Sequence, residues 1–345
     1  MTKRIILLLA ASLVLWGCTE KGSRYRSVDG FAQGSTFHIV YEIPSHITDC
    51  SQFELAVKDS VDIYFKRINK SVSGYDSTSV LSQINRGENP LLDKIFIDVF
   101  NYACQIYRVS GGAVDASAAP LFDIWGFGFK NNESVTQQKL DSFRQFIGMD
   151  KVSISPDNFL VKEDPRIKLN FNAIAQGYTS DYFAARFDAM GIGNYLLEIG
   201  GEVYCKGLNS KGKEWKVGID VPRDGNFIPG NELQAIIKLS GKGLVTSGNY
   251  RKFYVNEDGS KYSHTVDPKS GYPVSHSLLS ATVIAENATV ADGYATYFMV
   301  VGLERAKEIL AATPGMEALL VYGEQDNMKT YQTPGLKKMV EAVGK

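Results

Sequence analysis

Hydrophobic residues recur at helical spacing in several long stretches of the chain. In the first stretch, apolar residues three or four positions apart form one continuous face: Phe53, Val57, Val61, Tyr64, Phe65 and Ile68. Such spacing is typical of an amphipathic helix. Similar patterns, most of them ending near a glycine, predict further helices over residues 95–109, 173–190, 289–301 and 303–312.

Segments rich in β-forming residues lie between these helices and are separated by Gly, Pro and Asn turns. They cover residues 37–43, 195–205, 215–221, 233–239, 278–285 and 318–322, and a hairpin is predicted around a turn at 257–259. Helices and strands do not alternate regularly, and no Pro/Gly/Ser-rich linker divides the 345 residues. We therefore expect one α+β domain over residues 28–345, with a substantial antiparallel sheet and packed helices.

The start of the chain has the plan of an export signal. Two basic residues precede an apolar run over residues 5–15, and the run ends in Leu15-Trp16-Gly17-Cys18. A cysteine directly after a small residue resembles the bacterial lipobox, in which the cysteine is diacylated. We expect a signal peptide over residues 1–17, lipidation of Cys18 and a polar tether over residues 18–27. The chain would then be lipid-anchored at the bacterial cell membrane and face the periplasm; a signal without lipidation and a short anchor helix are the alternatives.

Composition narrows the range of functions. The chain has 37 basic and 38 acidic side chains, so it lacks the basic excess of nucleic-acid-binding proteins, and no nucleic-acid partner is expected. It contains no G-x-x-x-x-G-K-[ST] loop and no G-x-G-x-x-G between a strand and a helix. None of its four histidines is paired with another at i, i+4, which argues against a zinc site. The chemistry must therefore come from other segments.

Residues 110–128 and 170–178 combine small residues with polar groups that suit a ligand. In the first segment, glycines permit close approach to the backbone, and Asp115 can accept hydrogen bonds from a polar heterocycle. A helix end followed by an aromatic turn explains the same pattern without a ligand. In the second, Asn170 or Asn172 can cap the predicted helix, whose exposed N–H groups suit a phosphate. Capping alone also explains these asparagines.

Hydroxyl groups and a histidine flank the predicted hairpin. Several hydroxyls in residues 246–250 and 263–268 are thereby brought near His264. Its imidazole titrates near neutrality and suits proton transfer, although a structural role explains a single histidine as well. Farther along, Asp292 and Thr296 are four residues apart at a helix start and share one face. Their oxygens are ligands that Mg²⁺ prefers, but an acidic residue is favoured near any helix N-terminus.

Together these segments resemble the ApbE-type flavin transferases, bacterial lipoproteins that move FMN from FAD onto a target protein. The resemblance covers nearly all of the chain after the signal, with the family's segments in one order and at plausible spacing. The segments that carry it are residues 33–36, 75–85, 111–128, 170–178, 200–201, 246–250, 263–271 and 292–296. The Gly200-Gly201 pair among them fits either a tight β-connection or room for a ligand.

The resemblance implies roles at the matching positions only. It implies Mg²⁺ ligation by Asp292, Thr296 and the backbone carbonyl of Ala173, and a part in the transfer chemistry for His264. Three positions depart from the family's usual residues: Asn170 replaces Asp, Gln176 replaces Lys or Glu, and Gln33 replaces Met. Contacts with FAD are implied for Gln33, Tyr75, Ala113, Val114, Asp115, Asn170, Gln176 and Val266.

On this resemblance, the expected reaction is the Mg²⁺-dependent transfer of FMN from FAD to a threonine or serine hydroxyl of an acceptor redox protein, with release of AMP. Such a transfer needs positioning and charge neutralisation more than covalent help from the enzyme. An Mg²⁺-dependent FAD pyrophosphatase and a non-catalytic flavin-binding lipoprotein are the alternatives. The presence of His264, Asp292 and Thr296 together argues against the last one, because storage of flavin does not require them.

Overall fold

The computed structural model describes residues 23–128, 135–223, 230–249, 253–255, 261–263, 265–325 and 327–341. The predicted signal peptide (residues 1–17), Cys18 and His264 lie outside the described residues. In the ranges given, none of the helices combines the length and the hydrophobicity that crossing a membrane requires.

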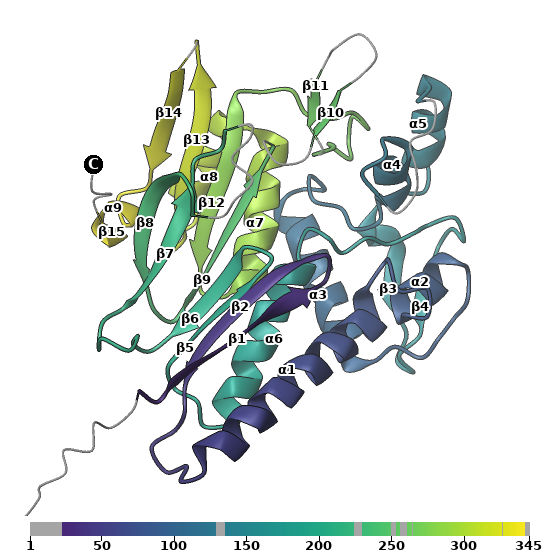
Figure 1. Ribbon diagram of the computed structural model, residues 1–345. Coiled ribbons are helices and arrows are strands. Elements are labelled where there is room, and N and C mark those ends of the chain that lie inside the picture. Colours follow the sequence, from purple (N-terminus) through teal and green to yellow (C-terminus); the bar gives the residue numbers. More distant parts are fainter. Residues whose placement is uncertain are drawn as a thin grey trace, which may run out of the picture.

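An eight-stranded sheet runs through the centre of the molecule (Figure 1). All of its neighbouring strands pair antiparallel. Every second residue of the second strand is buried, at Phe37, Ile39 and Tyr41, which gives the sheet an apolar face. In spatial order the strands are β1 (Tyr25–Ala32), β2 (Ser35–Glu42), β5 (Tyr195–Ile199), β6 (Glu202–Lys206), β9 (Lys242–Gly248), β12 (Leu278–Ala285), β13 (Glu317–Glu324) and β14 (Asn327–Gln332).

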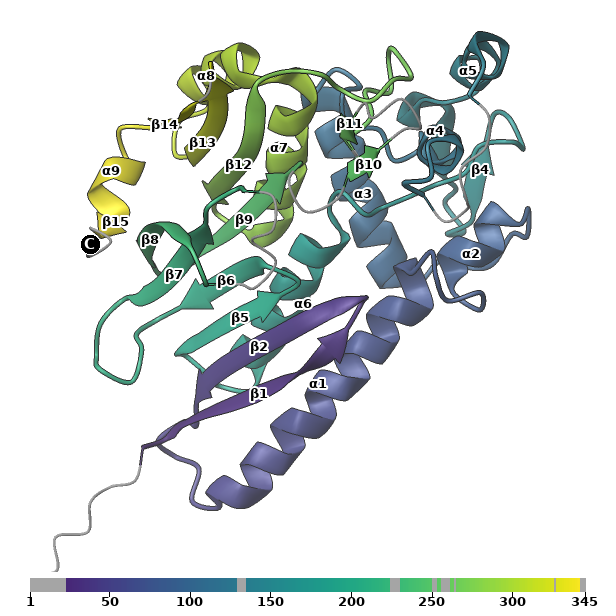
Figure 2. The ribbon, with the colours of Figure 1, turned by 45° about the horizontal axis from the view of Figure 1, so that its top comes forward.

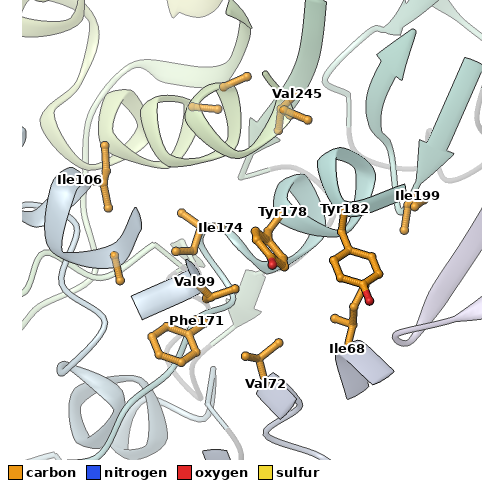
Figure 3. Packing of buried hydrophobic residues seen from close by; sticks show 14 of the residues in the cluster. Ile68, Val72, Val99, Ile106, Phe171, Ile174, Tyr178, Tyr182, Ile199 and Val245 are labelled. Atoms are coloured by element: carbon orange, nitrogen blue, oxygen red, sulfur yellow. The ribbon is translucent and has the colours of Figure 1, made fainter. Parts of the chain in front are cut away.

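Three long helices pack on that apolar face: α1 (Cys50–Val72), α6 (Ala175–Ala189) and α7 (Ala288–Val301). A fourth, α3 (Lys94–Val109), packs against α1 and α7. Figure 2 shows α1 along the β1–β2 edge of the sheet, while α6 contacts β5 and β6, and α7 contacts β9 and β12. Side chains from different helices meet in one buried cluster, including Val72, Val99 and Tyr178 (Figure 3). This packing places α6 directly against α7.

A second, three-stranded sheet covers part of the opposite face. It consists of β15 (Val340–Glu341), β8 (Leu233–Leu239) and β7 (Trp215–Asp220), in that order. Buried side chains of β7 and β8 pack against Val203, Leu244 and Leu319 of the central sheet. The molecule is therefore built in three layers: helices, a large sheet and a small sheet.

Smaller elements surround these layers. They are α2 (Val80–Asn85), α4 (Ala119–Ile124), α5 (Gln137–Arg144), a 3₁₀ turn (Met149–Lys151), β3 (Val152–Ile154), β4 (Leu160–Lys162), β10 (Phe253–Val255), β11 (Lys261–Ser263), α8 (Leu303–Ala312) and α9 (Leu336–Met339). Leu121 of α4 and Leu140 of α5 pack with Val266 in a separate apolar cluster. This cluster joins two segments that the sequence marks as candidates for ligand binding.

The α+β architecture and its antiparallel sheet are confirmed, and two boundaries need correction. The single strand signal over 195–205 is a hairpin, in which Gly200 and Gly201 form the turn with φ of 72° and 102°. The tether predicted over residues 18–27 overlaps β1, which begins at Tyr25. Just before that strand, the Arg24 guanidinium donates to the backbone carbonyls of residues 43, 44 and 47, so the folded domain begins before residue 28.

Candidate functional site

A cavity of about 1190 Å³ opens between the ends of the central strands, α6 and α7. It exceeds the roughly 300–1,000 Å³ of pockets that hold drug-sized ligands, so it has room for a dinucleotide. One lobe extends past Glu198 of β5 to the small sheet at β7. The predicted FAD- and Mg²⁺-binding residues all line this cavity: Gln33, Tyr75, Ala113, Val114, Asp115, Asn170, Ala173, Gln176, Val266, Asp292 and Thr296.

The tip of the β1–β2 hairpin reaches the cavity through Gln33. Gln33 and Gly34 form its two-residue turn, with φ of 52° and 76°. Such turns favour Gly, Asn or Asp, because both residues need positive φ, so Gln33 holds a strained conformation. Its side-chain amide donates to Oγ1 of Thr179 at 3.0 Å, and that hydroxyl donates to the Ala175 carbonyl at 2.7 Å. The hairpin tip is thereby tied to the first turns of α6.

The loop after α3 places a buried carboxyl group in the cavity wall. Asp115 accepts hydrogen bonds from the backbone N–H of Ser117 at 2.8 Å and from its hydroxyl at 2.6 Å. Burial raises the pKa of Asp115 to about 6, although both hydrogen bonds oppose the shift. This side chain offers a ligand a polar group in a largely dehydrated wall.

The start of α6 faces the cavity, and the predicted cap is wrong. The helix begins at Ala175, and no side chain caps it. Asn170 instead accepts the N–H of Asn172 at 2.9 Å, which folds the preceding residues into a turn. Asn85 fixes this segment from outside, since its side-chain amide pairs with both backbone groups of Leu169 at 2.8 Å. An uncapped helix start at a cavity wall suits a phosphate.

Asp292 lies on α7 where that helix meets α6. Its carboxyl group is almost fully buried, and within the described residues it accepts one hydrogen bond, from the Gly177 N–H at 3.1 Å. Burial raises the pKa of Asp292 to about 8, with a smaller contribution from the neighbouring Asp181 carboxylate. A carboxylate in this position lacks the solvation that it has in water. A bound cation would supply the missing stabilisation.

Two residues without predicted roles hold α6 and α7 together. A Cβ atom on Gly177 would lie 2.5 Å from the Ala288 carbonyl oxygen and 2.8 Å from Cβ of Asp292, so only glycine permits this approach. Asp181 caps α7 from the neighbouring helix, by accepting the N–H groups of Ala288 at 2.9 Å and Thr289 at 2.8 Å. Both contacts join residues far apart in sequence, and neither has a local sequence signal.

The donor set at this junction fits Mg²⁺ better than a transition metal. Asp292, Thr296 and Ala173 all line the cavity and offer a carboxylate, a hydroxyl and a backbone carbonyl, which are hard oxygen ligands. Within the described part of the chain, no three His, Cys, Asp or Glu side chains form a group that could hold a metal ion. A metal here would therefore rely on one carboxylate together with neutral oxygens and its phosphate ligand.

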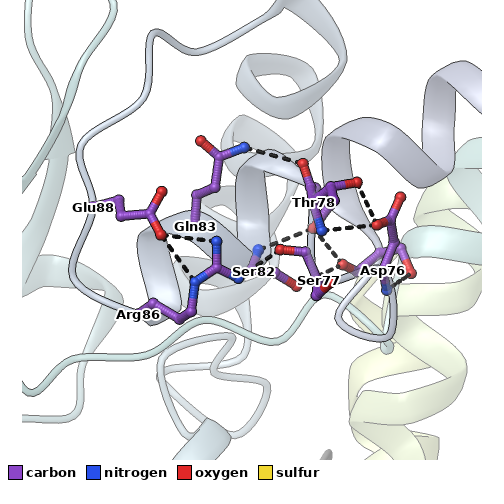
Figure 4. Close-up of polar contacts among 9 residues, drawn as sticks. Asp76, Ser77, Thr78, Ser82, Gln83, Arg86 and Glu88 are labelled. Atoms are coloured by element: carbon purple, nitrogen blue, oxygen red, sulfur yellow. Dashed lines mark hydrogen bonds and ion pairs between the residues drawn. The ribbon is translucent and has the colours of Figure 1, made fainter.

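Hydrogen bonds within residues 76–88 hold the segment after α1 in place (Figure 4). Asp76 accepts the N–H of Thr78 at 2.8 Å, and the Arg86 guanidinium donates to the Ser77 carbonyl at 2.5 Å. Tyr75 differs, because it lines the cavity while 76% of its surface is exposed. Its ring therefore stands at the cavity rim on a loop that internal hydrogen bonds hold in place.

The opposite rim is formed by the residues that follow β11. Thr265 and Val266 line the cavity, and the Thr265 hydroxyl donates to Oδ1 of Asn249 at 3.0 Å. Farther along, the Trp125 indole N–H donates to the Gly271 carbonyl at 2.8 Å, so the two glycine-containing segments support each other. His264 directly precedes Thr265 in the sequence and lies outside the described residues.

Comparisons with known proteins agree on one family. The model of the ApbE family matches residues 33–320. The FAD:protein FMN transferase of Haemophilus influenzae is 30% identical over 345 residues, which covers 97% of each chain. The protein of the same name from Vibrio cholerae is 31% identical over 337 residues, covering 96% of this chain and 97% of the relative.

Solved structures show the same similarity. The apo form of the flavinyl transferase ApbE from Pseudomonas stutzeri superposes with a TM-score of 0.81 at 29% identity, covering 93% of this chain and 98% of that one. The flavin transferase ApbE from Vibrio cholerae gives a TM-score of 0.79 at 30% identity, covering 92% and 99%.

Proposed function

Because the chain belongs to the ApbE family, we propose that it transfers FMN from FAD to a hydroxyl group of a target protein and releases AMP. One observation carries the proposal: a buried carboxyl group, Asp292, lies beside the uncapped start of α6 in a cavity large enough for a dinucleotide. This arrangement suits the neutralisation and positioning of a pyrophosphate, which phosphoryl transfer requires.

Mg²⁺ is the proposed cofactor, held by Asp292, Thr296 and the backbone carbonyl of Ala173. The burial of Asp292 supports this assignment, because a buried carboxylate needs a counter-charge or hydrogen bonds to replace its solvation by water. When bound, Mg²⁺ neutralises charge that develops on the pyrophosphate. The chain's own residues orient the substrate. The first turn of α6 faces the phosphates, while Asp115 and the Asn170 and Gln176 amides offer hydrogen bonds to polar groups of FAD.

The transfer itself exchanges one phosphate ester for another. The hydroxyl oxygen of the acceptor attacks the phosphorus of the FMN half, and the bond from that phosphorus to the bridging oxygen breaks. AMP leaves with the electron pair, and the hydroxyl proton passes to a base. We assign this base to His264, whose neighbours Thr265 and Val266 line the cavity.

A single incubation tests the proposal. The purified protein is mixed with FAD, Mg²⁺ and candidate exported redox domains, and the products are separated by denaturing electrophoresis and chromatography. Flavin fluorescence on an acceptor, together with released AMP, is the expected result. Free FMN and AMP without a labelled acceptor would identify a pyrophosphatase, and unchanged FAD would identify a binding protein.

The same assay addresses His264. With FAD already bound, His264→Ala should transfer FMN at least ~10²-fold more slowly in a single turnover, which is the usual range for loss of a general base. A saturated variant that retains more than about a tenth of the wild-type rate would contradict the assignment.

The proposed cellular location rests on the N-terminal sequence. We assign residues 1–17 to a signal peptide and Cys18 to a diacylated anchor, with the catalytic domain facing the periplasm. The acceptor is then an exported, membrane-linked redox protein. Cys18→Ser should release the protein from the membrane fraction or block its processing. Wild-type protein found outside the membrane fraction with an uncut N-terminus would refute the anchor.

A further inference from the structure

A second, smaller cavity of about 510 Å³ lies beside the one described above. The C-terminal ends of α3 and α7, the start of α8 and the turn at residues 267–269 form its walls. Of the described residues, it shares Ala113 and Val300 with the larger cavity. We call it the basic pocket, because three cationic side chains line it: Arg108, Lys269 and Arg305.

Among the described residues, two of these cations form no ion pair, and Asp267 is the acidic residue that lines the pocket with them. Arg305 pairs with Glu308 at 2.6 Å, and the Asp267 carboxylate accepts the backbone N–H groups of Lys269 and Ser270 at 3.0 and 3.2 Å. Neither Arg108 nor Lys269 forms an ion pair with any residue that the structure describes. Arg108 lies in the last turn of α3, where it also balances the helix dipole, whereas Lys269 is not at a helix end. The pocket therefore has an excess of positive charge.

The exposed Lys269 side chain lies beside the loop that follows α3. Gly111 and Gly112 adopt φ of 58° and 87°, and Cβ atoms on them would lie 4.0 Å from Nζ and 3.9 Å from Cε of Lys269. The lysine side chain thus runs over the two glycines that precede the Ala113–Asp115 wall of the larger cavity. The hydrogen bond from Trp125 to Gly271 supports the lysine's own turn.

The basic pocket also lies close to the proposed metal ligands. Thr296 and Val300 lie one helical turn apart on α7, which is a rise of about 6 Å, and Val300 belongs to both cavities. A group bound in the pocket would therefore be adjacent to the phosphates of FAD. Apart from Ala113, the predicted FAD-binding residues line only the larger cavity, so the proposed FAD site leaves the pocket open to another ligand.

We propose that the basic pocket docks the acceptor protein by binding acidic side chains that flank the modified hydroxyl. This inference rests on the proposed transferase function, since only a protein acceptor needs a site beside the FAD cavity. Charges at the edge of an interface mainly affect association and its dependence on salt, so the pocket should act on acceptor recognition and leave the chemical step unchanged.

The test uses the purified domain that becomes labelled in the incubation described above. At low ionic strength, Lys269→Glu and Arg108→Glu should each lower kcat/KM for this acceptor about tenfold, through KM, because an attraction is replaced by a repulsion. The saturated transfer rate and the FAD affinity should stay unchanged. Lys269→Arg should restore kcat/KM, and Lys66→Glu, an exposed change on α1, is the matched control.

A second arm changes the acceptor. Replacing the Asp and Glu residues next to its modified hydroxyl by Asn and Gln should lower kcat/KM with the wild-type enzyme and have little further effect with Lys269→Glu. Added salt should lower kcat/KM for the wild-type enzyme with the unchanged acceptor. It should have a smaller effect on the Lys269→Glu enzyme with the neutralised acceptor.

The outcomes separate two failures. Wild-type kcat/KM and salt dependence in both glutamate variants would overturn the docking site and leave the transferase function intact. Equal loss of FAD affinity in both variants would also overturn it, because the pocket would then belong to the FAD site. A wild-type enzyme that labels no acceptor would overturn the proposed function and the docking site with it.

Discussion

At the α6–α7 junction, Asp292 is 4% exposed, whereas at the cavity rim Tyr75 is 76% exposed. The two residues are also fixed differently. The junction depends on close helix packing at Gly177 and on Asp181 capping its neighbour, while the rim depends on short hydrogen-bonded turns. Packing holds a charged group rigidly in a dehydrated site, which suits chemistry. Turns leave side chains accessible, which suits recognition. Changes of the packing at the junction should therefore affect catalysis and folding together, a change of its carboxyl group should affect catalysis, and changes at the rim should affect binding alone.

The largest effect is expected from Asp292→Asn. We expect FMN transfer to fall about 10³-fold, because a metal ion stabilises the transition state by several kcal/mol and the variant loses the only carboxylate of the proposed Mg²⁺ site. The metal-free protein should not lose stability, because the amide oxygen can still accept the Gly177 N–H and position 292 no longer carries a buried carboxyl group. Transfer rates measure the loss of catalysis. The Tm without Mg²⁺ measures stability, and the rise in Tm on adding Mg²⁺ measures metal binding.

Asp188→Asn is the control for this change, since Asp188 lies at the far end of α6 and pairs with Lys206 at 2.9 Å. It should retain both the transfer rate and the Mg²⁺-dependent rise in Tm. Full transfer by the wild-type enzyme in excess EDTA would remove the metal assignment.

Gly177→Ala should separate packing from ligation. The added methyl group would meet the Ala288 backbone at 2.5 Å, so α6 and α7 must move apart, and overpacking of this kind costs about 1–3 kcal/mol of unfolding free energy. Transfer should fall as well, although no ligand is removed. In Gly193→Ala the new Cβ meets no atom within 4 Å, so this variant should remain near wild-type stability. Similar urea midpoints for the two variants would contradict this prediction, because α6 and α7 could then move apart without loss of stability.

The contrast between Gly177 and the predicted site residues shows which features of the fold and the site can be predicted from the sequence. Periodic apolar residues predict α1 and α3, because each of these helices buries one continuous face. The polar edge strand β14 has no such pattern, and its identity depends on pairing with β13.

The residues of the site also differ in whether the local sequence reveals their roles. The resemblance to the family indicates residues that line the cavity. Gly177 and Asp181 act on residues 115 and 107 positions away, so their roles exist only after the helices have packed. The false cap at Asn170 has a similar cause. Its side chain finds a backbone partner two residues away, and the intervening turn delays the start of α6.

Asp115 combines a property of each region: it is buried like Asp292 at the junction, and it is held by a turn like the residues at the rim. Its pKa is about 6 in the folded protein and about 3.9 in an unfolded chain, so the folded state binds more protons between these values. Wild-type stability relative to Asp115→Asn should therefore fall as the pH rises from about 4 to 6, by about 2–3 kcal/mol. Urea unfolding of both proteins across this range measures the difference.

Ser117→Ala sharpens that experiment. It removes the hydroxyl hydrogen bond that lowers the pKa of Asp115, so the pH-dependent loss of stability should extend to higher pH. A difference between wild type and Asp115→Asn that does not change with pH would mean that the carboxyl group is better solvated than its burial indicates.

The smallest effect is expected at the rim. Tyr75→Ala should change the unfolding free energy by less than about 0.5 kcal/mol, as is usual for exposed side chains. If the ring contacts FAD, its loss should weaken FAD binding by about three- to tenfold, which corresponds to the roughly 0.5–1.5 kcal/mol of an aromatic contact. The single-turnover rate with saturating FAD should not change, because the ring lies outside the α6–α7 junction.

Tyr75→Phe keeps the ring and should restore the affinity, which distinguishes stacking from a contact of the hydroxyl. Fluorescence titration with FAD decides the matter: unchanged affinity in Tyr75→Ala would remove Tyr75 from the binding site, and a slower saturated rate would show that the rim takes part in positioning the reacting groups.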